Sequence, residues 1–236
     1  MTDLFAVGEA TWPAAAQHAA GAFVVREGRG GGQRVSCATA EGSWSETDID
    51  AAEAVHQALG QPPLFMIRAD EDDLDAALAE RGYRIKDPVH IYSGPSASLA
   101  EPPPKPISAF ALWPPLAMMR DLWAEGGIGP ARLAVMERAE APKTAILGRV
   151  RDRASGVAYV AIHTETAMMH ALYVIPDQRR QGSALNIVRK SAGWAQHHGA
   201  ERFSVLVTQA NQSANALYSS LGMQIVGHYH YRSRQP

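Results

Sequence analysis

The stretch "DQRRQGSA" (Asp177–Ala184) lies between an apolar run, "ALYVIP", and a segment with helical periodicity, "ALNIVRKSAGWAQ". It therefore occupies a corner between a predicted strand and a predicted helix. The first amides of a helix have no partner within it, and the peptide dipoles give that end a partial positive charge. Gly182 allows close approach to the backbone, small residues follow it, and two arginines add cationic donors. This composition suits a diphosphate-binding corner.

A basic turn with one glycine is also common in solvated loops, so the corner alone does not identify a ligand. A second pattern, "NQSANALYSSLGM" (Asn211–Met223), begins 29 residues after Gly182. Tyr218 follows Asn211 by seven residues, which is about two helical turns, so both are expected on one side of a predicted helix. The two patterns together are far more specific than either one.

At these two places the chain resembles the GCN5-related N-acetyltransferases (GNAT). Their coenzyme A motif, R/Q-x-x-G-x-G/A, is matched by Arg179, Gly182 and Ala184. Their later motif, N-x-x-A-x-x-L-Y-x-x-x-G-F, is matched except that Met223 replaces the phenylalanine; the matching residues are Asn211, Ala214, Leu217, Tyr218 and Gly222. The resemblance covers about residues 107–234.

The resemblance implies the GNAT acyl-CoA N-acyltransferase fold, an α/β fold whose mixed, mostly antiparallel sheet is flanked by helices. Periodicity and turn residues independently predict two helices, a three-stranded meander, a helix over about 183–198, a strand, a helix over about 213–221 and a last strand. This order is that of a mixed α/β layer.

The proline-rich stretch "SGPSASLAEPPPKP" (Ser93–Pro106) predicts a stiff linker. It divides the chain into an amino-terminal half (1–92), the linker (93–106) and the catalytic domain (107–236). Residues 64–92 repeat the strand, helix, glycine and strand layout of the chain's end, with Leu78 in the place of Tyr218. The first half therefore resembles a degenerate GNAT-like copy, as in tandem acetyltransferases. Its "GRGGGQR" segment (28–34) predicts a hairpin turn between two strands rather than a phosphate cradle.

The resemblance also implies the residues that hold acetyl-CoA, the cosubstrate; no metal is expected. Backbone groups of the strand pair with the pantetheine arm, and the Leu172 N–H polarises the thioester carbonyl. Amides of the following turn hold the pyrophosphate, and the Asn211 side chain anchors the pantetheine or the adjacent turn. The complete expected set is Leu172, Tyr173, Val174, Arg179, Arg180, Gln181, Gly182, Ser183, Ala184, Asn211 and Tyr218.

Two residues are predicted to move protons. Tyr218 is the expected acid for the departing thiolate; the alternative is a half-buried core aromatic. His170 precedes Leu172 by two, so we expect both on one face of the strand. An imidazole near neutrality suits a base, although a histidine on an apolar strand can equally be a core residue. Met168 stands where some family members carry a glutamate or a second histidine.

Two further segments are candidate acceptor contacts. "WAEGGIGPAR" joins the first two predicted helices, where the family closes over its acceptor, so Trp123, Glu125 and Arg132 are candidates. "HYHYR" (228–232) alternates histidine and tyrosine, which places one pair along a cleft or indicates an edge strand with aromatic packing.

The composition is that of an ordinary globular protein: 236 residues, 46% hydrophobic, 19% charged and a net charge of -2. It argues against a strongly basic nucleic-acid surface. The lone Cys37 permits no intrachain disulfide, and neither a secretory signal nor an apolar run of about 18 residues is evident. We therefore expect a cytoplasmic protein without membrane or nucleic-acid partners; a homodimer is left open.

The predicted function is transfer of acetyl from acetyl-CoA to a primary amine of a small molecule or peptide. Direct attack by the amine is expected because no cysteine lies near the motifs. The alternative is a non-catalytic acyl-CoA-binding sensor or partner module, which Met168 favours because it fills a position where a base is used elsewhere. A dinucleotide-binding oxidoreductase is disfavoured because no G-x-G-x-x-G follows an early strand.

Overall fold

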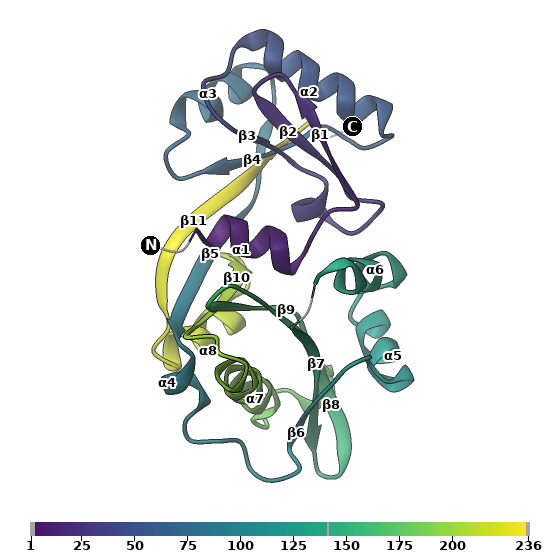
Figure 1. Cartoon of the computed structure of the whole chain (residues 1–236), viewed down its shortest axis with the longest axis vertical. Helices are drawn as coiled ribbons and strands as arrows, with labels where there is room; N and C mark the ends of the chain where they lie inside the picture. Colours follow the sequence, from purple (N-terminus) through teal and green to yellow (C-terminus); the bar gives the residue numbers. More distant parts are fainter. Residues whose placement is uncertain (1–2, 141, 235–236) are drawn as a thin grey trace. The chain divides into compact units, whose positions relative to one another are not determined.

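The computed structural model describes residues 3–140 and 142–234. These residues form two compact units (Figure 1). The larger unit comprises residues 3–13, 91–206 and 213–225, and the smaller unit comprises 14–90, 207–212 and 226–234. The first helix thus belongs to the unit built mostly from the second half of the chain, and the end of the last strand belongs to the other unit.

The larger unit holds most of the helices and a six-stranded order, β5-β10-β9-β8-β7-β6. β6 to β9 are joined by antiparallel ladders, and β9 pairs with β10 in parallel. Its elements are α1 (Leu4–Thr11), β5 (Arg84–Pro95, from residue 91), α4 (Ser96–Ala100), β6 (Ala109–Leu112), α5 (Ala117–Glu125), α6 (Pro130–Arg138), β7 (Lys143–Val150), β8 (Arg153–His163), β9 (Thr166–Val174), the 3-10 turn η2 (Pro176–Gln178), α7 (Ser183–His197), β10 (Arg202–Thr208, to residue 206) and α8 (Gln212–Ser220, from residue 213).

Alternate residues of β9 face different helices, as a pleated strand requires. Met169 faces α7, where its sulfur lies 3.6 Å from the Ser191 hydroxyl oxygen. His170 faces α1 and bonds to Thr11. The sheet of this unit is therefore covered on one face by α7 and on the other by α1 and α5. Both faces are buried, which explains the nearly continuous apolar reading of β8 and β9.

The smaller unit has the strand order β1-β2-β3-β4-β11. The β3–β4 pair is parallel and the others are antiparallel. Its core contains Phe23, Phe65 and Tyr83, whose rings meet edge to face. Its elements are β1 (Ala16–Ala20), β2 (Phe23–Glu27), the 3-10 turn η1 (Gln33–Val35), β3 (Ala38–Ala40), α2 (Glu46–Ala58), β4 (Leu64–Arg68), α3 (Asp72–Glu80), and parts of β5 and β11 (Gln224–Ser233).

The predicted internal repeat is present in the structure. β4, α3 and β5 follow one another as β10, α8 and β11 do. Gly82 and Gly222 end the two helices in the left-handed region, with φ of 84° and 77°. Leu78 and Tyr218, at equivalent positions, are both buried. The last strands differ in their partners, because β11 pairs with β4 whereas β5 neighbours β10.

Two local predictions need correction. The proline-rich stretch is not extended throughout, since β5 continues to Pro95 and α4 follows at Ser96–Ala100; only the described residues 101–108 lack helix and strand. The glycine-rich segment does connect antiparallel strands, but it includes the start of η1 and is longer than a tight hairpin. In both places the chain is packed against the protein and is not a solvated turn. Ser96 and Leu99 of α4 are buried, and so is Val35 of η1.

Asp75 on α3 anchors the end of β11 in the smaller unit. Its two carboxylate oxygens accept hydrogen bonds from Arg232 at 2.6 Å each, and one also contacts His230 Nε2 at 2.6 Å. The hydrogen bond from Arg232, followed by that from His230, lowers the pKa of Asp75. A lowered carboxyl pKa stabilises the fold above the unfolded-state pKa, about 3.9, and this contribution is lost as pH falls through the folded-state pKa.

We therefore expect Asp75→Asn to lower the free energy of unfolding by about 1–3 kcal/mol at pH 7, because the Arg232 guanidinium loses its charged partner. The difference from the wild type should begin to narrow as pH falls below about 4, because protonation progressively makes Asp75 as neutral as the asparagine. Urea unfolding across pH 3–8 measures this. Asp73→Asn, at an exposed carboxylate of the same helix, is the matched control. If the free energies of unfolding of Asp75→Asn and of the wild type differed by the same amount at every pH, the Asp75–Arg232 ion pair would not be the cause.

Candidate active site

At the corner between β9 and α7, no side chain caps the first amides of α7. The first hydrogen bond inside α7 is donated by the Asn186 amide to the Gly182 carbonyl, at 3.0 Å. The amides of Ser183, Ala184 and Leu185 precede it and have no partner within the helix. Gly182 caps the helix with φ 83°, and no side chain caps it. A fifteen-residue helix thus presents its positive end at an exposed glycine.

The side chains of this corner leave the backbone accessible. A Cβ placed on Gly182 would meet no atom within 4 Å, so the space beside the amides is open. Ser183 points inward, where its hydroxyl hydrogen-bonds that of Ser155 at 2.6 Å. Arg179 and Arg180 are exposed, and the Arg179 Nε donates to the Val174 carbonyl at 3.2 Å. Gln181 donates to the Asp177 carbonyl at 3.0 Å. The predicted pyrophosphate residues are therefore gathered around one open helix end.

β9 and β10 pair over only part of their lengths. The described parallel ladder joins Thr166–Met169 to Arg202–Val205 and ends there. β9 continues to Val174. Leu172 and Tyr173, in this last part, are half-buried. The edge of β9 beyond the ladder is thus available to an extended ligand that pairs with backbone groups, as a further strand would.

The end of β9 contains a β-bulge. Tyr173 pairs with Val157 and His170 pairs with Tyr159. Between these two pairs β9 therefore has one residue more than β8. Ala171, inside the bulge, has φ 52°. Partners opposite each other share a face, which places Tyr173, and not Leu172, on the face of His170. The expectation that His170 and Leu172 share a face is wrong because the extra residue shifts the alternation.

His170 lies beneath α1 and is 6% exposed. Its Nε2 is 2.9 Å from the Thr11 hydroxyl oxygen, and that hydroxyl donates to the Val7 carbonyl at 2.7 Å. A hydroxyl has one hydrogen, so its oxygen accepts from His170 Nε2–H, and the neutral ring carries its lone pair on Nδ1. The rings of Trp12 and Tyr159 lie 5.1 and 6.1 Å from the imidazole. These contacts fit a core residue, and a base role requires Nδ1.

Tyr218 on α8 is 4% exposed, and burial raises its pKa above the usual 10. Its ring lies 5.7 Å from that of Tyr92. The phenol therefore stays protonated at neutral pH, which a proton donor needs. Asn211 immediately precedes α8, where its amide donates to the Thr208 carbonyl at 3.0 Å. Asn211 belongs to the smaller unit and Tyr218 to the larger one.

A sequence model described as the acetyltransferase (GNAT) family matches residues 114–223, which span the bulge, the corner and the whole of the second motif. This segment, residues 114–223, belongs to the GNAT acetyltransferase family. No protein of curated function matches the sequence.

Solved GNAT structures share the fold over nearly the whole chain. A GCN5-related N-acetyltransferase from Kribbella flavida superposes with a TM-score of 0.71 at 15% identity, covering 99% of this chain and 95% of that one. An acetyltransferase of the GNAT family, described as putative, from Novosphingobium aromaticivorans gives 0.57 at 17% identity, covering 93% and 92%. A tandem GNAT protein from the clavulanic acid biosynthesis pathway gives 0.59 at 11% identity, covering 85% and 76%. At such identities these likenesses concern the fold, and the tandem protein agrees with a GNAT-like smaller unit.

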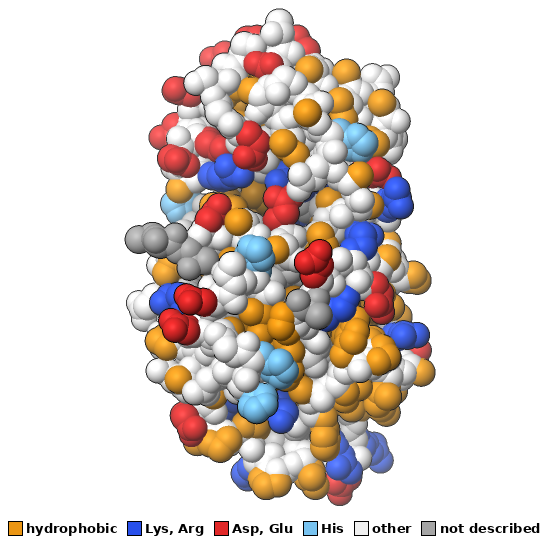
Figure 2. Space-filling view, in the orientation of Figure 1, with side chains coloured by type: hydrophobic (Ala, Val, Ile, Leu, Met, Phe, Trp, Pro, Cys, Tyr) orange, Lys and Arg blue, Asp and Glu red, His pale blue; other side chains and the backbone are white. Residues whose placement is uncertain are grey.

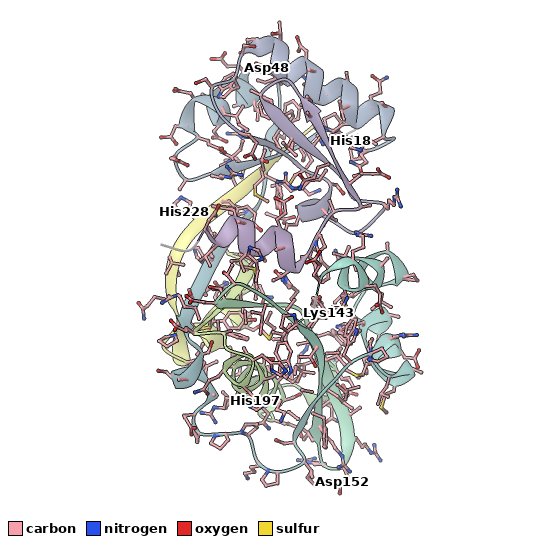
Figure 3. All side chains as sticks on the ribbon, viewed as in Figure 1. His18, Asp48, Lys143, Asp152, His197 and His228 are labelled. Atoms are coloured by element: carbon pink, nitrogen blue, oxygen red, sulfur yellow. The ribbon has the colours of Figure 1, made fainter. Side chains whose placement is uncertain are left out.

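The smaller unit of this GNAT protein closes its equivalent strand-to-helix corner with its own carboxylate. α2 follows β3 as α7 follows β9. The Asp48 side chain (labelled in Figure 3) accepts from the Ser45 amide at 2.8 Å and from the Ala22 amide at 3.2 Å. The hydrogen bonds from Ser45 lower the pKa of Asp48. This helix start therefore has a capping box made by the protein's own side chains, which α7 lacks.

Acidic side chains gather on the smaller unit (Figure 2). They line a cleft of about 860 Å³ beside this corner; its lining includes Glu41, Asp70, Glu71, Asp72, Asp73, Trp44 and Arg68. A carboxylate-lined cleft is a poor place for the phosphates of a coenzyme. The corner of the larger unit, Asp177–Ala184, contains one acidic residue, Asp177, beside the two exposed arginines.

The candidate acceptor contacts have different places in the structure. Glu125 and Arg132 are exposed, and Glu125 accepts a hydrogen bond from the Tyr173 hydroxyl at 2.9 Å. Trp123 is completely buried, so it is not a surface contact. On β11, Tyr229 and Tyr231 are buried and pack edge to face, whereas His228 (Figure 3) is exposed. The aromatic-packing interpretation fits this strand.

The sequence did not reveal the bulge or the residue that contacts it. Trp123 Nε1 donates to the Ala171 carbonyl at 2.9 Å. The only signal for such a contact is a tryptophan on the apolar face of a predicted helix, which ordinarily indicates packing. In the part of the chain that the structure describes, no cluster of three or more metal-ligating side chains occurs. Nor, within those residues, is any helix long and apolar enough to span a bilayer.

Proposed function

We propose that the larger unit transfers acetyl from acetyl-CoA to a primary amine of a small molecule or peptide. The observation that carries the proposal is the open amino-terminal end of α7, capped by Gly182 in a left-handed conformation and flanked by two exposed arginines. A pyrophosphate would accept hydrogen bonds from the amides that precede Asn186 and would lie at the positive end of the helix dipole.

The pantetheine arm would pair with the edge of β9 where its ladder with β10 has ended. Leu172, Tyr173 and Val174 supply the backbone groups there. The Leu172 amide, inside the bulge, would donate to the thioester oxygen as negative charge develops on it. The amine nitrogen would form a bond to the acetyl carbon while the carbon–sulfur bond breaks, and Tyr218 would donate a proton to the thiolate.

The acceptor amine has to lose a proton during the transfer. His170 is the base that the sequence proposes, and Nδ1 is the nitrogen that this role would use, since Nε2 faces the Thr11 hydroxyl. Because Nε2 is bonded to Thr11, the orientation of the ring is fixed whether it acts as a base or as a packing residue. The two roles therefore differ in the pH dependence of the reaction and not in the geometry of the ring.

We expect His170→Gln to remove the acidic limb of the pH–rate profile if His170 is the base. The glutamine amide can replace the Nε2–H donor toward Thr11 but cannot take up a proton. In the wild type, kcat/KM should fall as pH falls through the pKa of the base. Thr11→Val is the control, since it removes the partner and retains the imidazole. An acidic limb that persists in His170→Gln would assign His170 to the core.

Thiol release separates catalysis from binding. The protein is mixed with acetyl-CoA and a panel of primary amines that includes spermidine, glucosamine and a lysine peptide, and free thiol is followed with a chromogenic disulfide. Amine-dependent release supports the transferase. Calorimetric binding of acetyl-CoA with no release from any amine would favour the acyl-CoA sensor, for which Met168 at a position used by bases elsewhere is the supporting feature.

A further inference from the structure

The bulge in β9 carries backbone strain at a residue that is not glycine. Ala171 has φ 52°, a left-handed conformation in which the Cβ comes close to its own backbone. A strained residue of this kind persists only when its surroundings hold it. Something outside the strand must therefore keep the bulge in place.

Trp123 makes the contact that can hold it. The side chain lies on α5 with no exposed surface, and its indole N–H donates to the Ala171 carbonyl at 2.9 Å. Neighbouring residues fit closely around the same segment. A Cβ on Gly126 would lie 2.5 Å from the Tyr173 ring, and a Cβ on Gly156 would lie 2.5 Å from the Tyr173 carbonyl oxygen. The bulge is thus packed between α5 and β8.

The Ala171 carbonyl and the Leu172 amide belong to one peptide plane. In a trans peptide the C=O and N–H bonds point in opposite directions across that plane. Fixing the carbonyl toward Trp123 therefore fixes the Leu172 N–H on the side away from α5. A hydrogen bond accepted by the carbonyl also polarises the peptide and strengthens the N–H as a donor.

We propose that Trp123 is a positioning residue for acetyl transfer: through the Ala171 carbonyl it orients and polarises the Leu172 amide that stabilises the thioester oxygen. This inference rests on the proposed function. Trp123 touches neither the acyl group nor the coenzyme, and its effect is transmitted by a single peptide unit. The role belongs to the transition state, since negative charge on the oxygen develops there.

The first test compares Trp123→Phe with the wild type. Phenylalanine keeps an aromatic ring in the pocket but lacks the N–H. We expect kcat to fall about 10- to 100-fold, a part of the 10²–10³-fold loss typical for an oxyanion donor, while the Kd for acetyl-CoA changes less than about threefold. If the phenylalanine variant folds poorly, Trp123 can be replaced by 3-benzothienylalanine, which keeps the shape of the side chain without the N–H. This variant should show the same fall in kcat with a nearly unchanged Kd for acetyl-CoA.

Controls and rescue test the transmission through the bulge. Trp194→Phe, on α7 of the same unit, should leave kcat unchanged. Ala171→Gly removes the left-handed strain, so in the Trp123→Phe background it should restore kcat about five- to tenfold. Wild-type kcat in Trp123→Phe would overturn the proposal, and so would a parallel loss of coenzyme binding, since that pattern describes a purely structural residue.

A second readout does not depend on activity. In the full chain without coenzyme, the NMR signal of the Leu172 amide should shift in Trp123→Phe and not in Trp194→Phe. If the wild type releases no thiol but the signal shifts, the proposed function fails and the conformational role of Trp123 stands. If the signal is unchanged, Trp123 does not orient this amide, whatever the protein catalyses.

Discussion

Gly182→Glu is expected to weaken the binding of acetyl-CoA at least about 30-fold, corresponding to about 2 kcal/mol. The reason is charge and not volume, since a Cβ at this position would meet no atom within 4 Å. The new carboxylate can reach the amides at the start of α7, compete for them and repel the phosphates. Isothermal titration calorimetry with acetyl-CoA measures the change directly.

Gly199→Glu is the matched control for backbone strain. Gly199 follows the other end of α7, has φ 86°, and likewise has open space around a Cβ. Its substitution should cost similar stability and leave the coenzyme affinity unchanged. Gly182→Asn should bind nearly normally, because asparagine tolerates the left-handed region and carries no charge. Equal affinities in Gly182→Glu and Gly199→Glu would remove this corner as the phosphate site.

Local sequence patterns predicted the elements that carry the motifs. The helix expected over about 183–198 is α7, Ser183–His197, and the helix expected over about 213–221 is α8, Gln212–Ser220. Both begin after turn residues and end at a glycine with positive φ, so short-range chemistry fixes their limits. The open helix start at Gly182 follows from the same local rules.

Long-range packing decided what the sequence did not predict. A bulge adds one residue to one strand, and nothing in "MMHALYV" marks where it falls, since it depends on the pairing with β8. The contact of Trp123 with Ala171 joins residues 48 positions apart. The contact of Thr11 on α1 with His170 joins residues 159 positions apart, and the sequence of α1 does not indicate that His170 is its partner. These contacts arise from tertiary structure and are invisible to periodicity.

The internal repeat shows that the two units share a fold and differ at the positions of the candidate site. The smaller unit retains the parallel strand pair, the helix after it and the glycine at the end of its second helix. It replaces the open helix start by the Ser45–Asp48 capping box. Where the larger unit has Tyr218, it has Leu78, which preserves burial without a hydroxyl. Packing tolerates this exchange, whereas the proton transfer proposed for Tyr218 would not.

Tyr218→Phe is expected to lower kcat about 100-fold and to leave the Kd for acetyl-CoA within about twofold of the wild type. General acid catalysis contributes typically 10²–10⁴-fold, and phenylalanine preserves the packing of a ring that is 4% exposed. Because burial raises the pKa of the phenol, the alkaline limb of the wild-type kcat profile should lie above pH 10, the ordinary value for tyrosine. Single-turnover thiol release from pH 6 to 10 tests both points.

Tyr92→Phe is the matched control, because its ring lies 5.7 Å from that of Tyr218 and its hydroxyl donates to Asn215 Oδ1 at 3.1 Å. Loss of that neighbouring hydroxyl should change stability slightly and kcat very little. If both variants keep full activity, the thiolate takes its proton from solvent and Tyr218 is a core aromatic. If both lose activity equally, packing around α8, and not proton donation by Tyr218, limits the reaction.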